Sequence, residues 1–163
     1  MKLALRNFVS AELDLILAAN EANLPHVNSL NLEQFTELAT KTAYFKVATL
    51  DEKLAGFLMA MTPKADYASD NYQWFCRQYD EFIYVDRIIT LDYARGHGVG
   101  SALYQDIEKY CRGHGISRIC CEVNIRPANE VSTQFHEKRM FKQVNKQQTE
   151  GGKKSVSLRV KTL

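Results

Sequence analysis

The fold is decided by the stretch Arg95-Gly96-His97-Gly98-Val99-Gly100-Ser101. It follows an apolar run, residues 82–91, which is predicted to be a strand, and it precedes an amphipathic segment, residues 98–112, which is predicted to be a helix. Glycines let a backbone turn sharply and approach a ligand closely. Backbone N–H groups at a helix N-terminus attract an anion, because the positive end of the helix dipole lies behind them. The stretch therefore predicts a phosphate-binding loop.

Two common glycine loops are excluded by the spacing. No Lys followed by Ser or Thr is present in the loop, so it is not a Walker P-loop, and glycines at 96, 98 and 100 do not fit G-x-G-x-x-G. The pattern that fits is Arg-x-x-Gly-x-Gly. On a strand, loop and helix, this pattern resembles the acetyl-CoA pyrophosphate loop of the GNAT N-acetyltransferase superfamily. The alternative is a glycine-rich turn that binds nothing.

Length and composition predict one globular domain spanning residues 1–163. Hydrophobic residues make up 45% of the chain and charged residues 25%, which is ordinary for a soluble protein. The net charge of +2 is too small to indicate nucleic-acid binding. No apolar run is long enough for a membrane span, and residues 1–6 lack a signal-peptide core. We therefore expect a cytoplasmic protein with no nucleic-acid or membrane partner.

The cysteines predict neither a metal site nor a disulfide. They are Cys76, Cys111, Cys120 and Cys121, and they form no C-x-x-C pair and none lies beside a histidine at zinc spacing. Cys120 and Cys121 are neighbours in a predicted strand and should face opposite ways. We expect reduced, mostly buried thiols.

Hydrophobic periodicity and turn residues predict the order βααββ(α)βαβαββ, a mixed-sheet α/β domain. The predicted strands are 2–8, 44–50, 53–61, 82–91, 116–125, 141–149 and 153–163. Three of the predicted helices begin at the N-cap candidates Ser10, Asp70 or Asn71, and Asn129. The other two are predicted to start near Ser29 or Asn31 and at about Gly98. In the strand 82–91, alternation places Tyr84, Asp86, Ile88 and Thr90 on one face and Val85, Arg87 and Ile89 on the other.

The segment 62–81 is rich in aromatic residues and allows two interpretations. Trp74 and Phe75 are predicted to pack on the core. Tyr67 and Tyr72 are candidates for a lid over an acceptor pocket, because long insertions between elements often serve binding.

A second motif strengthens the resemblance. Glu122-Val123-Asn124 is followed by Pro127-x-Asn129-x-x-Ser132-x-x-Phe135-His136-Glu137-Lys138 and then Phe141. This run resembles the second cofactor motif of GNAT enzymes, and the two motifs occur in the family's order on the expected elements. The chain is thus identified as a member of this superfamily. The resemblance implies a mixed, mostly antiparallel central sheet with helices on both faces, and acetyl-CoA as co-substrate without a metal.

The chain departs from the family pattern at two positions. His136 stands where the family usually has Tyr, the general acid in many members, and Met140 stands where it usually has Gly. The first change leaves the identity of the acid open. The second predicts a negative φ at Met140 or a turn of another shape. The nearest resemblance is to bacterial proteins of similar length, which predicts a bacterial origin but brings no substrate with it.

The predicted cofactor site combines both motifs. The loop N–H groups would hold the pyrophosphate, with added charge from Arg95, while the His97 side chain would point to solvent. By resemblance, the backbone of the glycine-loop strand pairs with the pantetheine arm, and Asn129 contacts that arm or caps a helix. The predicted cofactor-binding residues are Ile88, Ile89, Thr90, Arg95, Gly96, His97, Gly98, Val99, Gly100, Ser101, Asn129, Ser132 and His136.

Acetyl transfer to an amine requires a base, because a lysine-type amine has a pKa of about 10.4. The position of the family's strand glutamate falls on Tyr84, which is a weak base. Asp86 and Glu122 are the carboxylate candidates. The alternative for Asp86 is an ion pair within the sheet, and for Glu122 a structural carboxylate at a strand end.

The leaving thiolate calls for a proton donor. His136 is the candidate, since an unperturbed histidine pKa of about 6.5 suits proton transfer. The alternative is a structural histidine. Ser132 lies on the same helix face, four residues earlier.

The sequence therefore predicts direct transfer of an acetyl group from acetyl-CoA to a primary amine of a small molecule, an amino acid or a peptide. One alternative is a non-catalytic acyl-CoA sensor, which Tyr84 in place of a glutamate favours. Another is a transferase that uses a different acyl-CoA or an O-acceptor. The resemblance also implies a homodimer, formed through a sheet edge or the C-terminal hairpin.

Overall fold

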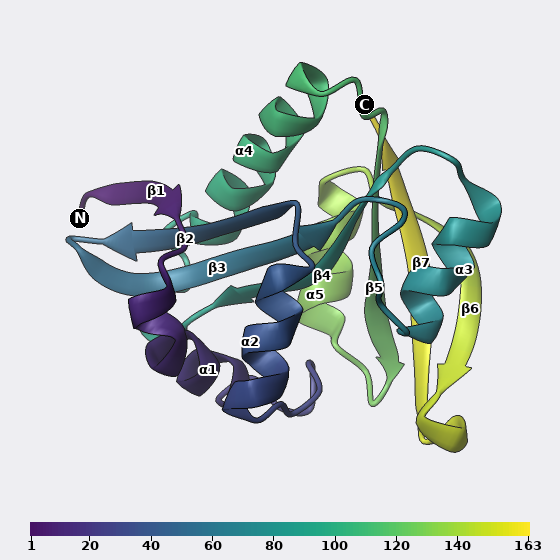
Figure 1. Ribbon diagram of the computed structural model, residues 1–163, viewed down its shortest axis with the longest axis horizontal. Helices are drawn as coiled ribbons and strands as arrows, with labels where there is room; N and C mark the ends of the chain where they lie inside the picture. The colour runs from purple at the N-terminus through teal and green to yellow at the C-terminus, as the bar shows by residue number, and fades with distance from the viewer.

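The computed structural model describes all residues, 1–163, and shows the predicted element order (Figure 1). The strands are β1 (Leu3–Asn7), β2 (Tyr44–Leu50), β3 (Lys53–Met61), β4 (Ile83–Thr90), β5 (Arg118–Arg126), β6 (Lys142–Thr149) and β7 (Lys154–Thr162). The helices are α1 (Leu13–Glu21), α2 (Leu32–Thr40), α3 (Asp70–Gln78), α4 (Val99–Gly113) and α5 (Glu130–Lys138). One seven-stranded sheet has the order β1-β2-β3-β4-β5-β7-β6, and only β4 and β5 are parallel. The predicted mixed, mostly antiparallel sheet is confirmed.

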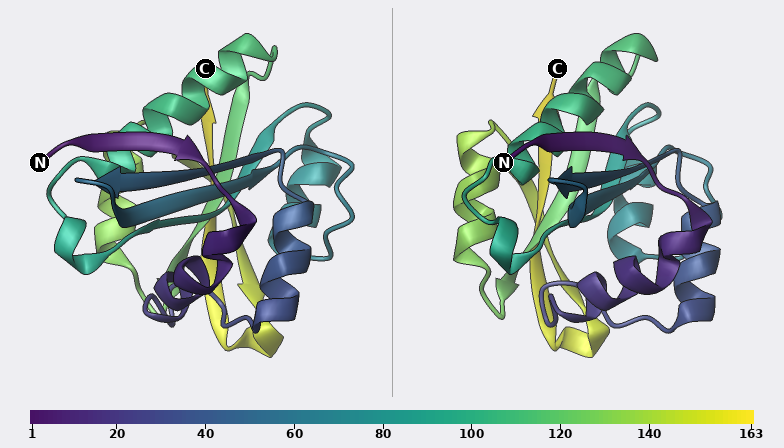
Figure 2. Two further views of the ribbon diagram at one scale, coloured as in Figure 1. Left: turned by 60° about the vertical axis from the view of Figure 1, so that its left-hand side comes forward. Right: turned by 90° about the vertical axis from the view of Figure 1, so that its left-hand side faces the viewer.

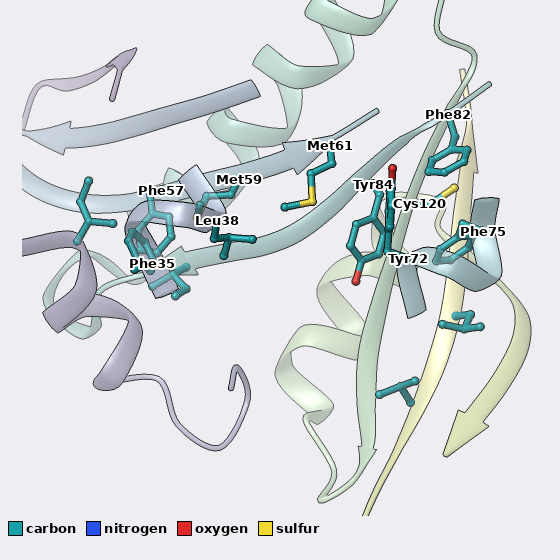
Figure 3. Close-up of a cluster of buried hydrophobic side chains, with 14 of the residues drawn as sticks. Phe35, Leu38, Phe57, Met59, Met61, Tyr72, Phe75, Phe82, Tyr84 and Cys120 are labelled. Atoms are coloured by element: carbon teal, nitrogen blue, oxygen red, sulfur yellow. The ribbon is translucent and has the colours of Figure 1, made fainter. Parts of the chain in front are cut away.

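Helices cover both faces of the sheet, as predicted (Figures 1 and 2). The core accordingly has two halves. One contains side chains of α1, α2 and α3, such as Phe35 and Phe75, together with Tyr84 of β4 (Figure 3). The other contains the α4 stripe, including Leu103 and Ile107. Cys120 belongs to the first half and Cys121 to the second, so the two neighbours do face opposite ways.

Helix starts follow local hydrogen bonding. Asn31 caps α2 in a capping box, in which its side chain accepts from the Gln34 N–H at 2.8 Å. Asn129 caps α5 by accepting from the Ser132 N–H at 3.2 Å. The prediction of Ser10 as an N-cap is wrong. Residues Ser10–Glu12 form a 3₁₀ turn, in which the Glu12 carboxylate accepts from the Val9 N–H at 3.0 Å.

A β-bulge changes the predicted faces of β4. Arg87 pairs with Met59, but Val85 pairs with Ala60, so Asp86 is an extra residue without a partner on β3. Past the bulge the alternation is therefore reversed. Tyr84 and Ile89 lie in the same half of the core, and Ile88 packs against the half that contains Val85. The prediction that Ile88 shares a face with Tyr84 is wrong.

The turn after α5 also differs from the expectation. Met140 has a φ of +69°, not a negative value. The Phe141 N–H donates to the His136 carbonyl at 3.0 Å, and the Met140 N–H donates to the Glu137 carbonyl at 3.0 Å. This bonding is a Schellman motif, which requires a left-handed residue at the position of Met140. A non-glycine residue there costs about 1–2 kcal/mol, so this turn is strained at Met140.

All four cysteines are free, and Cys111, Cys120 and Cys121 are buried. None of the helices has the length and apolar character that crossing a membrane requires. No three His, Cys, Asp or Glu side chains are grouped so that they could hold a metal ion.

Candidate active site

The site lies where the sheet opens between β4 and β5. These strands pair only at Ile83 with Ile119 and at Tyr84 with Cys120, and they diverge beyond those pairs (Figure 1). From Val85 to Thr90, β4 is paired on one side with β3, and its other edge faces the opening. Gly56 on β3 permits the close approach of β3 to β4, because a Cβ at that position would collide with the Ile89 carbonyl. The backbone of Ile88, Ile89 and Thr90 is thus available to a ligand.

The glycine loop closes one end of the opening. Gly96 and Gly98 have φ values of +79° and +78°, which favour glycine, and Gly98 is the left-handed N-cap of α4. The backbone N–H groups from Gly98 to Ser101 donate to no acceptor within the protein. Four free donors at the start of a 15-residue helix suit a pyrophosphate. Gly100 packs closely against α5, since a Cβ there would lie 3.1 Å from the ring of Phe135.

A groove of about 920 Å³ joins the loop to the opening between the strands. All predicted cofactor residues except His97 line it, and so do Asp86 and Glu122. His97 is exposed, as expected, and its N–H donates to the Ala94 carbonyl at 3.3 Å instead of to the groove. Tyr84 is fully buried and lies outside the groove. The free donors, the open strand edge and the groove together fit a phosphorylated ligand with a long arm such as acetyl-CoA.

Glu122, on β5, stands at the wall of the groove beside Tyr84. The Tyr84 hydroxyl donates to the Glu122 carboxylate at 2.5 Å. Burial and the nearby Asp86 charge raise the pKa of Glu122 to about 8, although hydrogen bonds from Tyr84 and Asn71 oppose the shift. A carboxyl group with a pKa near the working pH is suited to accept and release a proton.

Asp86 is committed to other partners. The Arg87 guanidinium donates to one carboxylate oxygen at 2.9 Å, and the Tyr67 hydroxyl donates to the other at 2.6 Å. Arg87 is itself buried and donates further to Asn20 and Asn28 on the α1 side. Asp86 thus takes part in the ion pair that the sequence offered as its alternative role, and both of its oxygens are occupied.

His136, on α5, packs against Tyr104 of α4. It is 3% exposed. Its Nδ1 atom is 2.7 Å from the Ser132 carbonyl oxygen, and its Nε2 atom is 2.6 Å from the Tyr104 hydroxyl. Burial, together with the charges of Arg159 and Arg139, lowers the pKa of His136 to about 4. The histidine is therefore neutral at physiological pH.

The two predicted lid residues, Tyr67 and Tyr72, lie in different places. Tyr67 lines the groove and its hydroxyl donates to Asp86, so its role as part of a lid stays a prediction. Tyr72 is fully buried, and its hydroxyl donates to the Thr62 carbonyl at 2.7 Å. It belongs to the core and not to a lid, because α3 begins at Asp70 and turns this residue toward Phe82 and Tyr84 (Figure 3).

Sequence reasoning missed Tyr104 altogether. This residue of α4 is fully buried and lines the groove. The apolar stripe predicted for the helix was Val99, Leu103, Ile107 and Tyr110. The available signal was the spacing of four from Gly100, which places Tyr104 on the helix face that meets α5.

Comparisons with known proteins agree with this geometry. The sequence matches the family described as "Acetyltransferase (GNAT) family" over residues 13–141, and the chain belongs to that family. The sequence matches no curated protein at a significant level.

Several solved structures share the fold at low sequence identity. Ard1 from Thermoplasma volcanium has a TM-score of 0.82 and 14% identity, covering 100% of this chain and 99% of that one. The ribosomal-protein-S18-alanine N-acetyltransferase from Escherichia coli has a TM-score of 0.75 and 12% identity, with coverage of 99% and 94%. Arabidopsis thaliana Naa50, in complex with the bisubstrate analogue CoA-Ac-MVNAL, has a TM-score of 0.75 and 16% identity, with full coverage of both chains.

Proposed function

We propose that this protein transfers an acetyl group directly from acetyl-CoA to a primary amine, with Glu122 as the general base. The observation that carries the proposal is the position of Glu122. This carboxyl group lines the same groove as the free N–H groups of the glycine loop, at the place where β4 and β5 separate. It supplies the base that Tyr84, at the family's glutamate position, does not.

Each part of the proposed reaction can be assigned to a feature of the groove. The N–H groups of Gly98 to Ser101 would bind the pyrophosphate, and the open edge of β4 would bind the pantetheine arm. Unpaired N–H groups on that edge would also stabilise the negative charge on the acetyl oxygen during transfer. Glu122 would take the proton from the acceptor nitrogen. Because its pKa is about 8, activity should rise with pH up to and through that value.

The acceptor is proposed to be a primary amine of a small molecule, an amino acid or a peptide. The Escherichia coli neighbour is named for an alanine of ribosomal protein S18, and the Naa50 structure holds a peptide-CoA analogue. These names make peptide α-amines the first acceptors to test. The net charge of +2 gives no reason to include nucleic acids or membranes as partners.

The cellular setting is proposed from the chemistry of the chain. Buried free thiols such as Cys120 and Cys121 suit a reducing cytoplasm, and the sequence resemblance favours a bacterial one. A homodimer formed through an edge strand or the β6–β7 hairpin is the expected assembly. Sedimentation at several protein concentrations tests it.

The first experiment is calorimetric binding of acetyl-CoA and CoA to the wild type and to Gly98→Trp. The bulky side chain should block the approach of the pyrophosphate to the loop. Gly115→Trp is the matched control, because Gly115 also has a positive φ, of +68°, and open space around it, but lies outside the groove. We expect binding to be lost in the first variant and kept in the second.

The second step is to measure thiol release from acetyl-CoA with and without a panel of amines and peptides. Amine-dependent release supports the transferase. Binding without any amine-dependent release would favour the acyl-CoA sensor, and release with hydroxyl compounds alone would favour an O-acceptor. A wild type that does not bind acetyl-CoA or CoA would refute the proposal.

A further inference from the structure

The hydrogen-bond directions around His136 are fixed by its neighbours. The Ser132 carbonyl oxygen, 2.7 Å from Nδ1, can only accept, so Nδ1 carries the proton of the neutral ring. Nε2 is then bare, and the Tyr104 hydroxyl, 2.6 Å away, must donate to it. With its one proton engaged by Ser132, the imidazole has none to offer to a ligand in the groove.

A second proton on His136 is strongly disfavoured at neutral pH. The residue is 3% exposed, and both Arg159 and Arg139 repel an imidazolium, which is why its pKa falls to about 4. Glu137 is the carboxylate nearest in sequence, but its oxygen faces Arg159, 3.4 Å away. Glu108 pairs with Arg139 and Lys161. No acidic side chain therefore contacts the ring to stabilise its charged form.

Tyr104, by contrast, has a hydroxyl that could reach a ligand lying in the groove. It lies one helical turn after Gly100 in the phosphate-binding end of α4, and it lines the groove. Its hydroxyl is also within hydrogen-bonding reach of the Cys121 thiol, and Cys121 immediately precedes Glu122 on β5. The hydroxyl thus lies along the groove between the phosphate-binding end of α4 and β5, the strand that carries Glu122, and a thioester arm lying in the groove would pass beside it.

We propose that the Tyr104 hydroxyl stabilises the leaving sulfur by donating a hydrogen bond to it, and that His136 holds this hydroxyl between turnovers. The inference rests on the proposed function, because it concerns the same groove and the same reaction. It assigns to α4 a role that the sequence pattern had suggested for α5.

The step is balanced without a proton from His136. The acceptor nitrogen forms a bond to the acetyl carbon, and Glu122 takes the proton from that nitrogen. The carbon–sulfur bond breaks, and its electron pair stays on sulfur, which leaves as a thiolate. The O–H of Tyr104 rotates from Nε2 of His136 to the thiolate, since a hydrogen bond to an anion is stronger than one to a neutral ring. Tyr104 keeps its proton throughout.

The test measures the pKa of the CoA thiol when CoA is bound, through the ultraviolet absorbance of the thiolate. A donor beside the sulfur lowers this pKa. We expect Tyr104→Phe to raise it by about one to two units, the effect of one hydrogen bond to a charged group. The same variant should reduce kcat about tenfold or more and leave the KM for acetyl-CoA nearly unchanged.

Tyr44→Phe is the matched control. Tyr44 is also buried in the α4 half of the core and its hydroxyl also bonds to α4, at Asp106, but it lies outside the groove. Its loss should leave the thiol pKa unchanged. His136→Phe provides a second variant that does not depend on Tyr104→Phe folding. It keeps an aromatic ring and frees the Tyr104 hydroxyl, so the thiol pKa should stay low.

Three outcomes would overturn the inference. The first is an unchanged thiol pKa in Tyr104→Phe, and the second is a raised thiol pKa in His136→Phe, which would make His136 the donor. The third is a shift of equal size in Tyr44→Phe, which would mean that packing alone sets the thiol pKa. None of these outcomes affects the proposed function. Failure of the wild type to bind CoA would refute both.

Discussion

Two hydrogen-bonded pairs, each made of a tyrosine and a titratable residue, lie on opposite sides of β5. Burial shifts the pKa values of the two titratable residues in opposite directions. On one face, the Tyr84 hydroxyl donates to Glu122 at 2.5 Å, and on the other, the Tyr104 hydroxyl donates to His136 at 2.6 Å. The geometry is nearly the same, and in both pairs burial is the largest influence on the pKa of the titratable partner. Yet the pKa of Glu122 is raised to about 8 and that of His136 is lowered to about 4.

The difference follows from the charge that each group carries when ionised. Burial disfavours a charged form, which is the deprotonated form of a carboxyl group and the protonated form of an imidazole. Glu122 is therefore moved into the range where proton transfer is useful, and His136 is moved out of it. Of these two groups, Glu122 is the one suited to exchange a proton near neutral pH, which supports its proposed role as the base.

The largest expected effect comes from removing that group. Glu122→Gln should lower kcat by at least about 100-fold, the usual contribution of a general base, while acetyl-CoA binding is retained. The rise of kcat/KM through pH 8 should disappear in the variant. The measurement is the pH dependence of kcat/KM with two acceptors whose amines differ in pKa. A rise that is due to Glu122 occurs at the same pH with both acceptors.

Glu150→Gln serves as the control for Glu122→Gln. Glu150 also lines the groove, but it is exposed. An equal loss in both variants would show that the groove needs negative charge in general and not a base at residue 122.

The sequence was sufficient for the element order and for most residues of the groove. Glycine spacing located the glycine loop at the start of α4, and the segment from Glu122 to Asn129 located a second part of the groove lining, because both depend on local backbone geometry. The faces of β4 could not be obtained by alternation, since the bulge at Asp86 depends on pairing with β3.

Non-local packing explains the other misses. The position of Tyr104 became visible only when α5 was packed against α4. The left-handed Met140 has a similar cause, since the chain must turn at once to bury Phe141, which is 2% exposed. A local propensity cannot predict a strain that is offset by burial elsewhere.

A smaller effect should appear in the pH dependence of stability, with opposite signs for the two pairs. His136 has a folded pKa below that of an unfolded histidine, so the unfolded chain binds more protons and stability rises as pH increases from about 4 to 6.5. Glu122 has a folded pKa above that of an unfolded glutamate, so stability falls as pH increases from about 4.5 to 8.

Denaturant unfolding of His136→Gln and Glu122→Gln, compared with the wild type at several pH values, measures both slopes. The His136 contribution should amount to about 3 kcal/mol over its full range, at 1.36 kcal/mol per pKa unit. If both differences had the same sign, the two groups would not be held neutral by burial as described.

The smallest effect is expected from Tyr84→Phe. The Tyr84 hydroxyl favours the ionised form of Glu122, so its removal should raise the pKa of Glu122 and move the activity limb to higher pH by about one unit, the value of one hydrogen bond. Activity at pH 7 should fall several-fold and recover in alkaline buffer.

Tyr72→Phe is the matched control for Tyr84→Phe. The Tyr72 ring packs 5.5 Å from that of Tyr84, but its hydroxyl bonds to the Thr62 carbonyl. Tyr72→Phe should therefore leave the pH–activity profile unchanged. A shift toward acid in Tyr84→Phe would contradict the assigned role of Tyr84.

The open edge of β4 has a consequence for the protein between encounters with its ligand. A strand edge with unpaired N–H and C=O groups is a template on which any extended chain can pair, and proteins usually cover such edges. Here the edge is internal and faces the groove, so the molecule resembles a sheet with one strand left out. A ligand arm bound there would pair with β4 in place of a strand. Binding of that ligand would then also protect the protein from aggregation through this edge.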